Sequence, residues 1–260
     1  MKLPSLYITG TGQPFVWMHG MLNSVESDSL YSLINFNRLA ELVSVVRYDT
    51  CNKSATGDYS WDAATGELLR MADVQNYDSM ILAGCSMGSG TAIHAAVRFP
   101  ERVKALILVT PPPAWEMRAD IKTIYNKIAA KADRDTIPEF LKRLIGQNQD
   151  PPEYFEQQHP GTRQQLLQHR LSFDPHYYSQ IYRGGAASDL PDRQLLAKIK
   201  VPTLIVAQLN DENHPFEMAQ QIHSLLKNSE LFTVSHYSEY LNLQENVYNF
   251  VKSVISDNKS

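Results

Sequence analysis

The order of segments along the chain predicts an α/β fold: a mostly parallel, doubly wound central sheet with helices on both faces. Short runs rich in Val, Ile and Leu alternate with amphipathic helical segments. These runs are apolar on both faces, as in a parallel sheet that helices cover on both sides. A strand, a glycine-flanked serine turn and a helix also follow one another over residues 79–98.

The individual elements follow from this pattern. The apolar runs predict strands over residues 15–18, 43–48, 79–83, 104–110, 203–207 and 231–234. The amphipathic segments predict helices over residues 30–42, 61–75, 88–98, 216–227 and 243–255. Functional groups of such a sheet lie at the carboxyl ends of its strands. The residues that follow each strand are therefore the candidate site residues.

The alternation stops at three consecutive prolines that begin at Pro111. Up to residue 200 there is no strand-like run, only helical segments that pairs of Pro and Gly interrupt. These segments cover residues 117–131, 137–145, 162–171 and 176–182. We predict a core of residues 1–113 and 193–260 and a helical cap of residues 114–192. Because the insertion leaves the sheet at its catalytic edge, we expect the cap to bind substrate rather than to be a surface subdomain without a role.

Length, charge and cysteine content narrow the class of protein. The 260 residues suit one α/β domain with an insertion. A net charge of -4 gives no electrostatic reason to expect a nucleic acid or an anionic membrane as partner. There is no signal-peptide core and no apolar run long enough to span a membrane. Two cysteines, Cys51 and Cys85, are too few for a disulfide scaffold. We expect a cytoplasmic protein with a small-molecule partner, and the oligomeric state stays open.

Residues 84–88, Gly-Cys-Ser-Met-Gly, fit the Gly-x-Ser-x-Gly turn that lifts a serine hydroxyl to the top of a parallel sheet. Gly84 and Gly88 are needed because side chains there would collide with the incoming strand or the outgoing helix. Ser86 at the apex is the predicted nucleophile. Cys85 is a rival nucleophile, but it precedes the apex, so its side chain should point back into the sheet.

A serine nucleophile needs a base and an acid that orients the base. In this architecture the chain order is Ser, then Asp or Glu, then His, after successive late strands. Asp211 follows the strand over residues 203–207 and is the predicted acid, with Glu212 as the alternative. His236 follows the strand over residues 231–234 and is the predicted general base.

The other histidines are weaker candidates. His94, in the helix that follows the Ser86 turn, is expected to have a packing or surface role. His223 is expected to face solvent from a helix. His214 precedes a proline and is expected to fix the loop of the acid. Nothing in the sequence supports a contact between a substrate and the histidines of the cap, which are His159, His169 and His176. No histidine or cysteine spacing resembles a zinc site, so we expect neither a metal nor a cofactor.

A tetrahedral intermediate needs two N–H donors for its oxyanion. One is expected from the backbone of Met87, at the positive end of the elbow helix. The other should come from the loop after the strand over residues 15–18, where Gly20 allows close approach of the backbone. Met21 is the expected donor and Leu22 the alternative, with a possible place for Leu22 in the substrate pocket. His19 supports this loop by hydrogen bonds.

Trp115 follows the three prolines at the entrance to the cap. Two roles stay open for its side chain. It lines the substrate pocket, or it anchors the first helix of the cap.

These residues resemble the α/β-hydrolase fold family over nearly the whole chain. The cap then follows the sixth of the eight strands usual in that family. The segments at residues 92–97 and 100–103, together with residues 111–116 at the cap entrance, are most similar to the 3-oxoadipate enol-lactone hydrolase-like branch. Two departures put the substrate in doubt. The loop from Asp49 to Ser54 lacks the family's usual glycines, and the oxyanion loop continues over residues 21–24, Met-Leu-Asn-Ser, where a glycine is usual. The few residues before His19 suggest that the first strand is absent.

The resemblance implies a cofactor-independent serine hydrolase of a small carboxylic ester or lactone, which acts through an acyl-enzyme. The same triad and cap also serve carbon–carbon bond hydrolases, acyl transferases and cofactor-free haloperoxidases. A second alternative is a binding protein on this fold that turns over nothing. Turnover separates that class from the enzymes, and a substrate screen separates the enzymes from one another.

Overall fold

The computed structural model describes residues 4–50, 57–132, 143 and 150–256, and within them it contains one seven-stranded sheet. The strand order is β1-β3-β2-β4-β5-β6-β7. Only β1 runs antiparallel, against β3 at the edge; every other neighbouring pair is parallel. The bounds are β1 Leu6–Thr9, β2 Pro14–Met18, β3 Ser44–Tyr48, β4 Met80–Cys85, β5 Val103–Val109, β6 Thr203–Gln208 and β7 Ser229–Val234.

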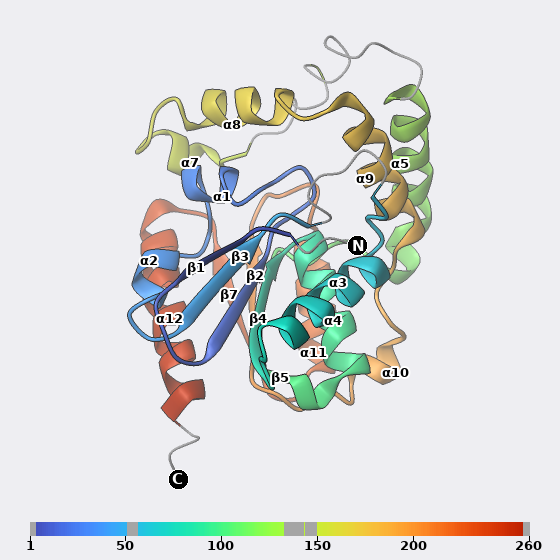
Figure 1. The fold of residues 1–260 in the computed structure, drawn as a ribbon. Helices are drawn as coiled ribbons and strands as arrows, with labels where there is room; N and C mark the ends of the chain where they lie inside the picture. The colour runs from blue at the N-terminus through green and yellow to red at the C-terminus, as the bar shows by residue number, and fades with distance from the viewer. Residues whose placement is uncertain (1–3, 51–56, 133–142, 144–149, 257–260) are drawn as a thin grey trace.

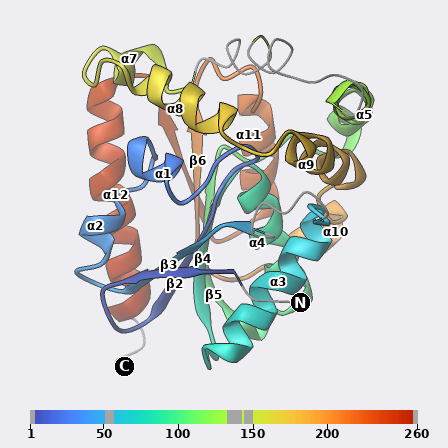
Figure 2. The same ribbon diagram turned by 45° about the horizontal axis from the view of Figure 1, so that its top comes forward.

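Helices cover both faces of the sheet, which confirms the predicted fold class (Figure 1). On one face lie α3 (Trp61–Val74), α4 (Met87–Arg98) and α11 (Phe216–Leu225). On the other lie α2 (Phe36–Leu39) and α12 (Tyr237–Ser256). Figure 2 shows the sheet edge-on between α12 and α3. Successive residues of one strand serve the two cores: Val16 packs on the first face and Trp17 on the second.

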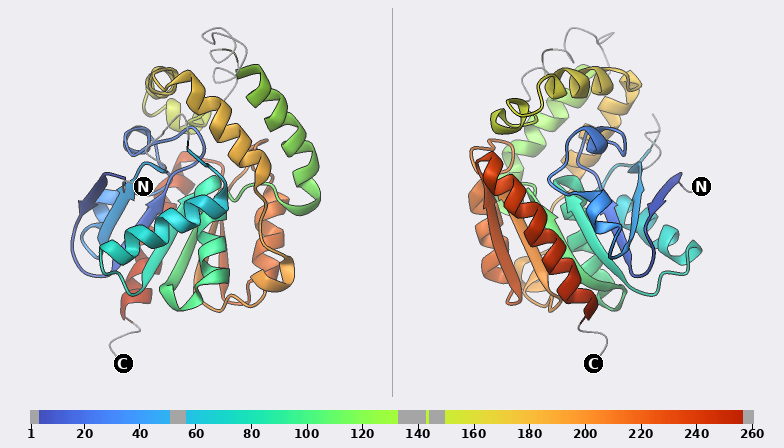
Figure 3. Two further views of the ribbon diagram at one scale, coloured as in Figure 1. Left: turned by 45° about the vertical axis from the view of Figure 1, so that its right-hand side comes forward. Right: turned by 90° about the vertical axis from the view of Figure 1, so that its left-hand side faces the viewer.

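Between β5 and β6 the described residues form helices and no strand. They are η3 (Trp115–Met117), α5 (Arg118–Ala132), α7 (Glu153–Glu156), α8 (Thr162–Leu171), α9 (Pro175–Ala187) and α10 (Arg193–Leu196). We call α5, α7, α8 and α9 the cap helices. They lie together above one end of the sheet in both views of Figure 3. The division at residues 113/114 and 192/193 remains a prediction, and the helix expected over residues 137–145 falls almost wholly outside the described residues.

Arg118 joins the segment that enters the cap helices to the segment that leaves them. Its buried guanidinium donates from Nε to the carbonyl of Ser188 at 2.6 Å and from Nη1 to that of Pro113 at 3.2 Å, and from Nη2 to the carbonyl of Gly185. The segment that enters the cap and the segment that leaves it are thus held by one side chain. The same guanidinium lies over the ring of Trp61, with Cζ 4.8 Å from its centroid.

Three predicted elements differ from the structure. The helix expected over residues 30–42 is two short helices, α1 (Ser27–Leu30) and α2, because Tyr31 is extended and Asn35 caps the second helix. The helix α9 continues through Gly184, where a break was expected. A Cβ at Gly184 would lie 2.3 Å from the backbone of Tyr59, so this glycine permits close packing instead of ending the helix.

The third difference bears directly on the site. The last helix, α12, begins at Tyr237 and not near residue 243. Glu239 in its first turn accepts hydrogen bonds from the backbone N–H of Ser235 and of His236. This reach of a first-turn carboxylate back to the residue before the helix is a capping arrangement. It leaves two residues, Ser235 and His236, between β7 and α12.

Candidate active site

Ser86 occupies a strained turn between β4 and α4. Its backbone has φ of 51° and ψ of -110°, outside the regions that L-residues favour. A Cβ at Gly84 would lie 2.3 Å from the carbonyl carbon of Gly88, and a Cβ at Gly88 would lie 2.0 Å from the carbonyl oxygen of Met18. Glycine is therefore required at both flanks. The turn holds the Ser86 hydroxyl at the carboxyl end of β4, half-buried and ahead of the helix N-terminus.

The neighbouring thiol is a poor rival for this role. Burial raises the pKa of the Cys85 thiol to about 12, although its hydrogen bond with Thr110 acts in the opposite direction. A thiol with that pKa stays protonated at neutral pH, and the thiolate is the nucleophilic form. Of the two adjacent side chains, only the Ser86 hydroxyl has a base within reach.

That base is His214. Its Nε2 lies 2.8 Å from Ser86 Oγ, and its Nδ1 lies 2.7 Å from Asp211 Oδ2. If Nδ1 carries the proton and donates to the carboxylate, Nε2 is left as the acceptor of the serine proton. Ser86, His214 and Asp211 thus form a continuous chain of hydrogen bonds in the order that serine nucleophiles require.

The loop after β6 contains both Asp211 and His214. The backbone N–H of His214 donates to the carbonyl of Asp211 at 3.2 Å, and the N–H of Asn213 donates to the Asp211 carboxylate at 2.9 Å. Burial by itself would raise the pKa of Asp211, but the hydrogen bond and charge of His214 and the two backbone donors outweigh it and hold this pKa below its usual value. Asp211 therefore stays ionised at neutral pH.

The structure does not bring the predicted base to Ser86. His236 is exposed, and its backbone N–H is held by Glu239. Only Ser235 separates it from β7, because α12 begins at the next residue. In the structure, His214 lies at the position beside Ser86 that His236 was expected to take. The signal in the sequence was the spacing: His214 lies three residues after Asp211, within one turn of the same loop.

The oxyanion loop, residues 19–24 after β2, lies against the elbow. A Cβ at Gly20 would lie 3.7 Å from Ser86 Cβ, an ordinary van der Waals distance, so the loop backbone lies beside the nucleophile. His19 is buried and supports the loop: Nδ1 lies 2.8 Å from the carbonyl of Gly20, and Nε2 lies 3.1 Å from the backbone nitrogen of Thr50. Nδ1 is then the protonated ring nitrogen, which donates, and Nε2 accepts.

The same loop contains a strained turn. The backbone N–H of Asn23 donates to the carbonyl of Gly20 at 3.1 Å, and Leu22 has φ of 64°. Met21 is not among the residues with positive φ, so the turn has the pattern of type II, which normally has glycine at the third position. A leucine there costs about 1–2 kcal/mol. Met21, the expected oxyanion donor, lies inside this turn, and Met87 is the first residue of α4, where N–H groups lack intrahelical partners.

Comparison with known proteins identifies the family to which this fold belongs. The family model described as the alpha/beta hydrolase fold matches residues 75–245, which is most of the chain. The chain belongs to the α/β-hydrolase fold family.

Individual members of the family differ in activity. The chain is 30% identical over 184 residues to an AB hydrolase superfamily protein of Bacillus subtilis, a match that covers 66% of the chain and 64% of that relative, less than two thirds of its length. It is 25% identical to a proline iminopeptidase of Heyndrickxia coagulans over 89% of the chain and 86% of the relative. The enol-lactonase structure from Burkholderia xenovorans superposes with a TM-score of 0.74 at 18% identity, over 98% of this chain and 96% of that one, and this likeness shows the fold alone.

In this α/β hydrolase, Trp115 contacts the segment that leaves the cap. Its backbone N–H donates to Asp189 Oδ1 at 2.9 Å, its indole N–H donates to the carbonyl of Pro191 at 3.0 Å, and the Arg193 guanidinium lies over its ring. These contacts favour the anchoring role over a place in the pocket. The side chain of Leu22 is buried. The unusual feature of this residue is its backbone, which has a positive φ.

The remaining histidines bond to groups other than Ser86. His94 Nε2 lies 2.8 Å from the carbonyl of Asp189, His159 Nε2 lies 3.0 Å from the Tyr237 hydroxyl, His169 Nε2 lies 2.7 Å from Ser24 Oγ, and His223 Nδ1 lies 2.8 Å from Ser229 Oγ. His176 is exposed on α9. Among the described residues no three His, Cys, Asp or Glu side chains converge to hold a metal, and no helix of these residues is long and apolar enough to cross a membrane.

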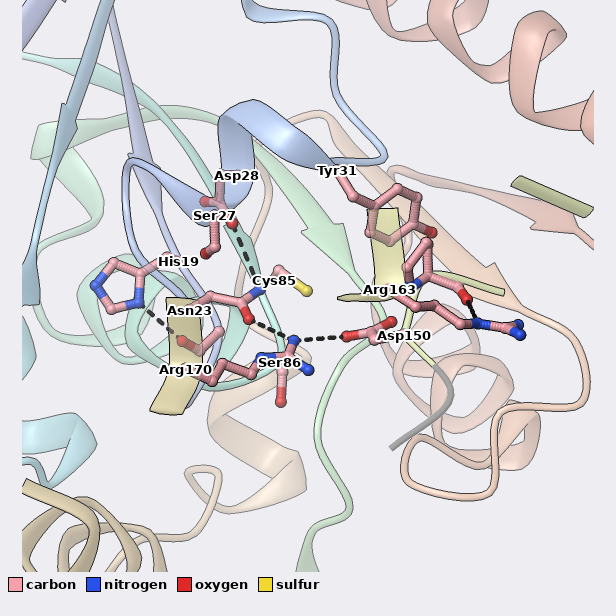
Figure 4. A network of polar contacts seen from close by, with 12 residues as sticks. His19, Asn23, Ser27, Asp28, Tyr31, Cys85, Ser86, Asp150, Arg163 and Arg170 are labelled. Carbon is pink, nitrogen blue, oxygen red and sulfur yellow. Dashed lines mark hydrogen bonds and ion pairs between the residues drawn. The ribbon is translucent and has the colours of Figure 1, made fainter. Parts of the chain in front are cut away.

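A polar network beside the nucleophile was not anticipated from the sequence. Figure 4 shows the Arg170 guanidinium of α8 between Asn23 of the oxyanion loop and Asp150 of the cap. Arg170 Nη2 donates to Asn23 Oδ1 at 2.9 Å and lies 3.1 Å from Asp150 Oδ2. The link between residues 23 and 170 depends on how the cap docks, which the pattern of a single sequence does not encode.

Proposed function

We propose that this protein is a serine hydrolase of small carboxylic esters or lactones, with Ser86 as nucleophile, His214 as general base and Asp211 as the acid that orients the base. The observation that supports it most is the pair of hydrogen bonds on His214, 2.8 Å to Ser86 Oγ and 2.7 Å to Asp211 Oδ2. Geometry of this kind activates a hydroxyl that is otherwise a weak nucleophile.

In the first half of the reaction, His214 Nε2 takes the proton of Ser86 as Oγ attacks the substrate carbonyl. The charge that develops on the carbonyl oxygen is accepted by the backbone N–H groups of Met21 and Met87. Asp211, ionised at neutral pH, compensates the imidazolium. Collapse of the intermediate breaks the carbon–oxygen bond, and the leaving alkoxide takes the proton from His214. For a lactone the leaving oxygen stays attached to the acyl group.

In the second half, His214 takes a proton from water, which attacks the acyl-enzyme carbonyl. The same two N–H groups accept the second oxyanion. Collapse then returns the proton from His214 to Ser86 Oγ and releases the carboxylic acid. No electrons are exchanged with a cofactor in either half. In this proposal the cap helices, which lie above one end of the sheet (Figure 3), form the upper wall of the substrate pocket.

The decisive experiment compares the two histidines. We expect His214→Ala to lower kcat for a p-nitrophenyl ester by about 10⁴-fold or more, as removal of a base from a serine triad does. His236→Ala is the matched control and should leave kcat within about two-fold, because its side chain is exposed. Labelling by a fluorophosphonate probe should depend on Ser86 and His214 in the same way. Full activity in Ser86→Ala or in His214→Ala would exclude the mechanism, and loss of activity in His236→Ala alone would return the base to its predicted position.

The class of substrate needs a second measurement. A panel of aryl esters of increasing acyl length, alongside several lactones, would fix the reaction class and the acyl size that the pocket accepts. We expect turnover of short acyl esters or lactones that is lost in Ser86→Ala. Tight binding of these compounds without any turnover would favour the binding-protein alternative instead.

A further inference from the structure

The strained turn of the oxyanion loop is held from outside by the cap. Asn23 ends this turn, and Ser24 follows it. Both side chains are bonded to consecutive residues of α8: Arg170 Nη2 donates to Asn23 Oδ1 at 2.9 Å, and His169 Nε2 lies 2.7 Å from Ser24 Oγ. Leu22, in the position that usually requires glycine, disfavours the turn, so these contacts from α8 oppose its relaxation, together with the contact of His19 with the carbonyl of Gly20 within the core.

The Asn23 side chain is clamped on both of its polar atoms. Its Oδ1 accepts from Arg170, and its Nδ2 donates to Asp28 Oδ1 at 3.4 Å. Arginine only donates and a carboxylate only accepts, so the amide has one orientation that satisfies both partners. Removal of Arg170 leaves the longer and weaker of the two contacts to hold Asn23.

Arg170 is itself well fixed. Its side chain is 3% exposed and pairs with Asp150 Oδ2 at 3.1 Å, and its backbone carbonyl accepts a hydrogen bond from the Tyr178 hydroxyl of α9. Figure 4 shows its guanidinium reaching from α8 to Asn23 and Asp150. A rigid donor at the end of a fixed side chain can transmit the position of the cap to the loop below it.

We propose that Arg170 is a positioning residue that holds the turn of residues 20–23, and with it the Met21 N–H, in the orientation that accepts the oxyanion. This inference rests on the proposed serine-hydrolase function. The Ser86, His214 and Asp211 chain is built wholly from the core, whereas one of the two oxyanion donors depends on the cap. Docking of α8 therefore completes the oxyanion hole.

Another arginine of the same helix provides a matched control. Arg163 bonds to Glu153 Oε2 and to the carbonyl of Pro151, both within the cap, and among the described residues none of its side-chain hydrogen bonds reaches the oxyanion loop. Arg163→Ala removes the same charge from the same helix. Its effect measures what the cap loses in general when an arginine of α8 is removed.

The test uses the full chain with Arg170→Ala, Arg170→Lys, Asn23→Ala and the double variant of Arg170 and Asn23. We expect Arg170→Ala to lower kcat for a neutral aryl ester by about 10 to 100-fold, less than the loss of an oxyanion donor outright. Affinity for a trifluoromethyl ketone, whose Ser86 adduct carries the oxyanion, should fall by a similar factor. KM should stay within about three-fold, and the midpoint of the pH profile should not move because His214 and Asp211 are untouched.

The companion variants sharpen the assignment. Asn23→Ala should show the same loss, the double variant no further loss, and Arg170→Lys a partial recovery, since a lysine retains one donor. Circular dichroism and the unfolding midpoint check that each variant folds; if Arg170→Ala does not, Arg170→Lys and Asn23→Ala carry the test.

Three results would overturn the inference. They are an unchanged kcat in Arg170→Ala, an equal loss in Arg163→Ala, or a loss confined to esters that bear a carboxylate, which would mean that Arg170 contacts the substrate directly. A wild-type protein without Ser86-dependent turnover refutes the proposed function instead, and the inference falls with it. Ser86-dependent turnover with any of the three results refutes the inference alone.

Discussion

The free energy of unfolding should depend strongly on Arg118, the side chain that joins the segments entering and leaving the cap. We expect Arg118→Met to destabilise the native state strongly while it preserves most of the apolar stem. The substitution removes the donors of three backbone carbonyls, those of Pro113, Gly185 and Ser188, and the cation over the Trp61 ring. No carboxylate forms a salt bridge with this guanidinium among the described residues, so its hydrogen bonds are what compensate its burial.

The magnitude follows from opposing terms. Hydrogen bonds to a charged donor contribute about 1.5–3 kcal/mol each, and the cation over an aromatic ring contributes about 0.5–2 kcal/mol. Against this, the variant no longer buries a charge, a burial strong enough to lower the pKa of Arg118 and to cost several kcal/mol. We expect a net loss of about 3–5 kcal/mol, which is what remains when the cost of burying the charge is subtracted from the three hydrogen bonds and the cation–ring contact.

Thermal unfolding followed by circular dichroism measures this loss. A protein of this size loses about 2–4 °C in Tm per kcal/mol, so Arg118→Met should unfold roughly 10 °C below the wild type. Arg163→Met, in which the lost guanidinium is partly exposed and bonded within the cap, should unfold within about 3 °C of the wild type. If the two variants unfold at the same temperature, the carbonyl contacts of Arg118 do not hold the cap.

The remaining predictions concern the site and its supports. Asp211→Asn should lower kcat by about 10³ to 10⁴-fold with little change in KM, because the base loses its compensating charge. The folded-state pKa of Asp211 is depressed, so its carboxylate stabilises the fold above about pH 4, and this contribution is lost as the pH falls through the folded pKa. The Tm difference between wild type and Asp211→Asn should therefore shrink on acidification below pH 4, and a constant difference would contradict it. Gly88→Ala should abolish soluble expression or cost more than about 3 kcal/mol in urea unfolding, since the new Cβ meets the carbonyl of Met18. Gly184→Ala should cost about 1–3 kcal/mol by the same measurement, because its Cβ meets the backbone of Tyr59.

Apolar runs and glycine positions in the sequence predicted the central strands and the turn at Ser86, because neighbouring residues determine these parts of the fold. The strands that run apolar on both faces were found within a few residues, and the elbow glycines were assigned for the reason that the structure gives. The edge strand β1 was missed because its residues are mostly exposed and carry no buried run. Gly184 was taken for a break because its purpose, the close approach of Tyr59, depends on a contact far away in the sequence.

The start of α12 decided the assignment of the base. The helix was expected over residues 243–255, which would leave His236 in a loop after β7. Glu239 instead caps the helix at Tyr237 and fixes the backbone of His236. Chain order alone cannot distinguish a histidine in a mobile loop from one at a capped helix start. The number of residues between β7 and α12 does distinguish them, and this number depends on where the helix begins.

The placement of His214 changes what the loop after β6 must do. In the arrangement expected from chain order, acid and base come from separate loops, and the sheet must hold the two in register. Here both lie in one turn, where the N–H of His214 bonds back to the carbonyl of Asp211 and the side chains bond to each other. A disturbance of β7 or α12 should then leave the acid–base pair intact, whereas a disturbance of the cap should act through Arg170 on the oxyanion loop. In the proposed mechanism, attack by Ser86 and stabilisation of the oxyanion thus depend on different parts of the chain, so variants of α12 and variants of α8 should affect catalysis independently.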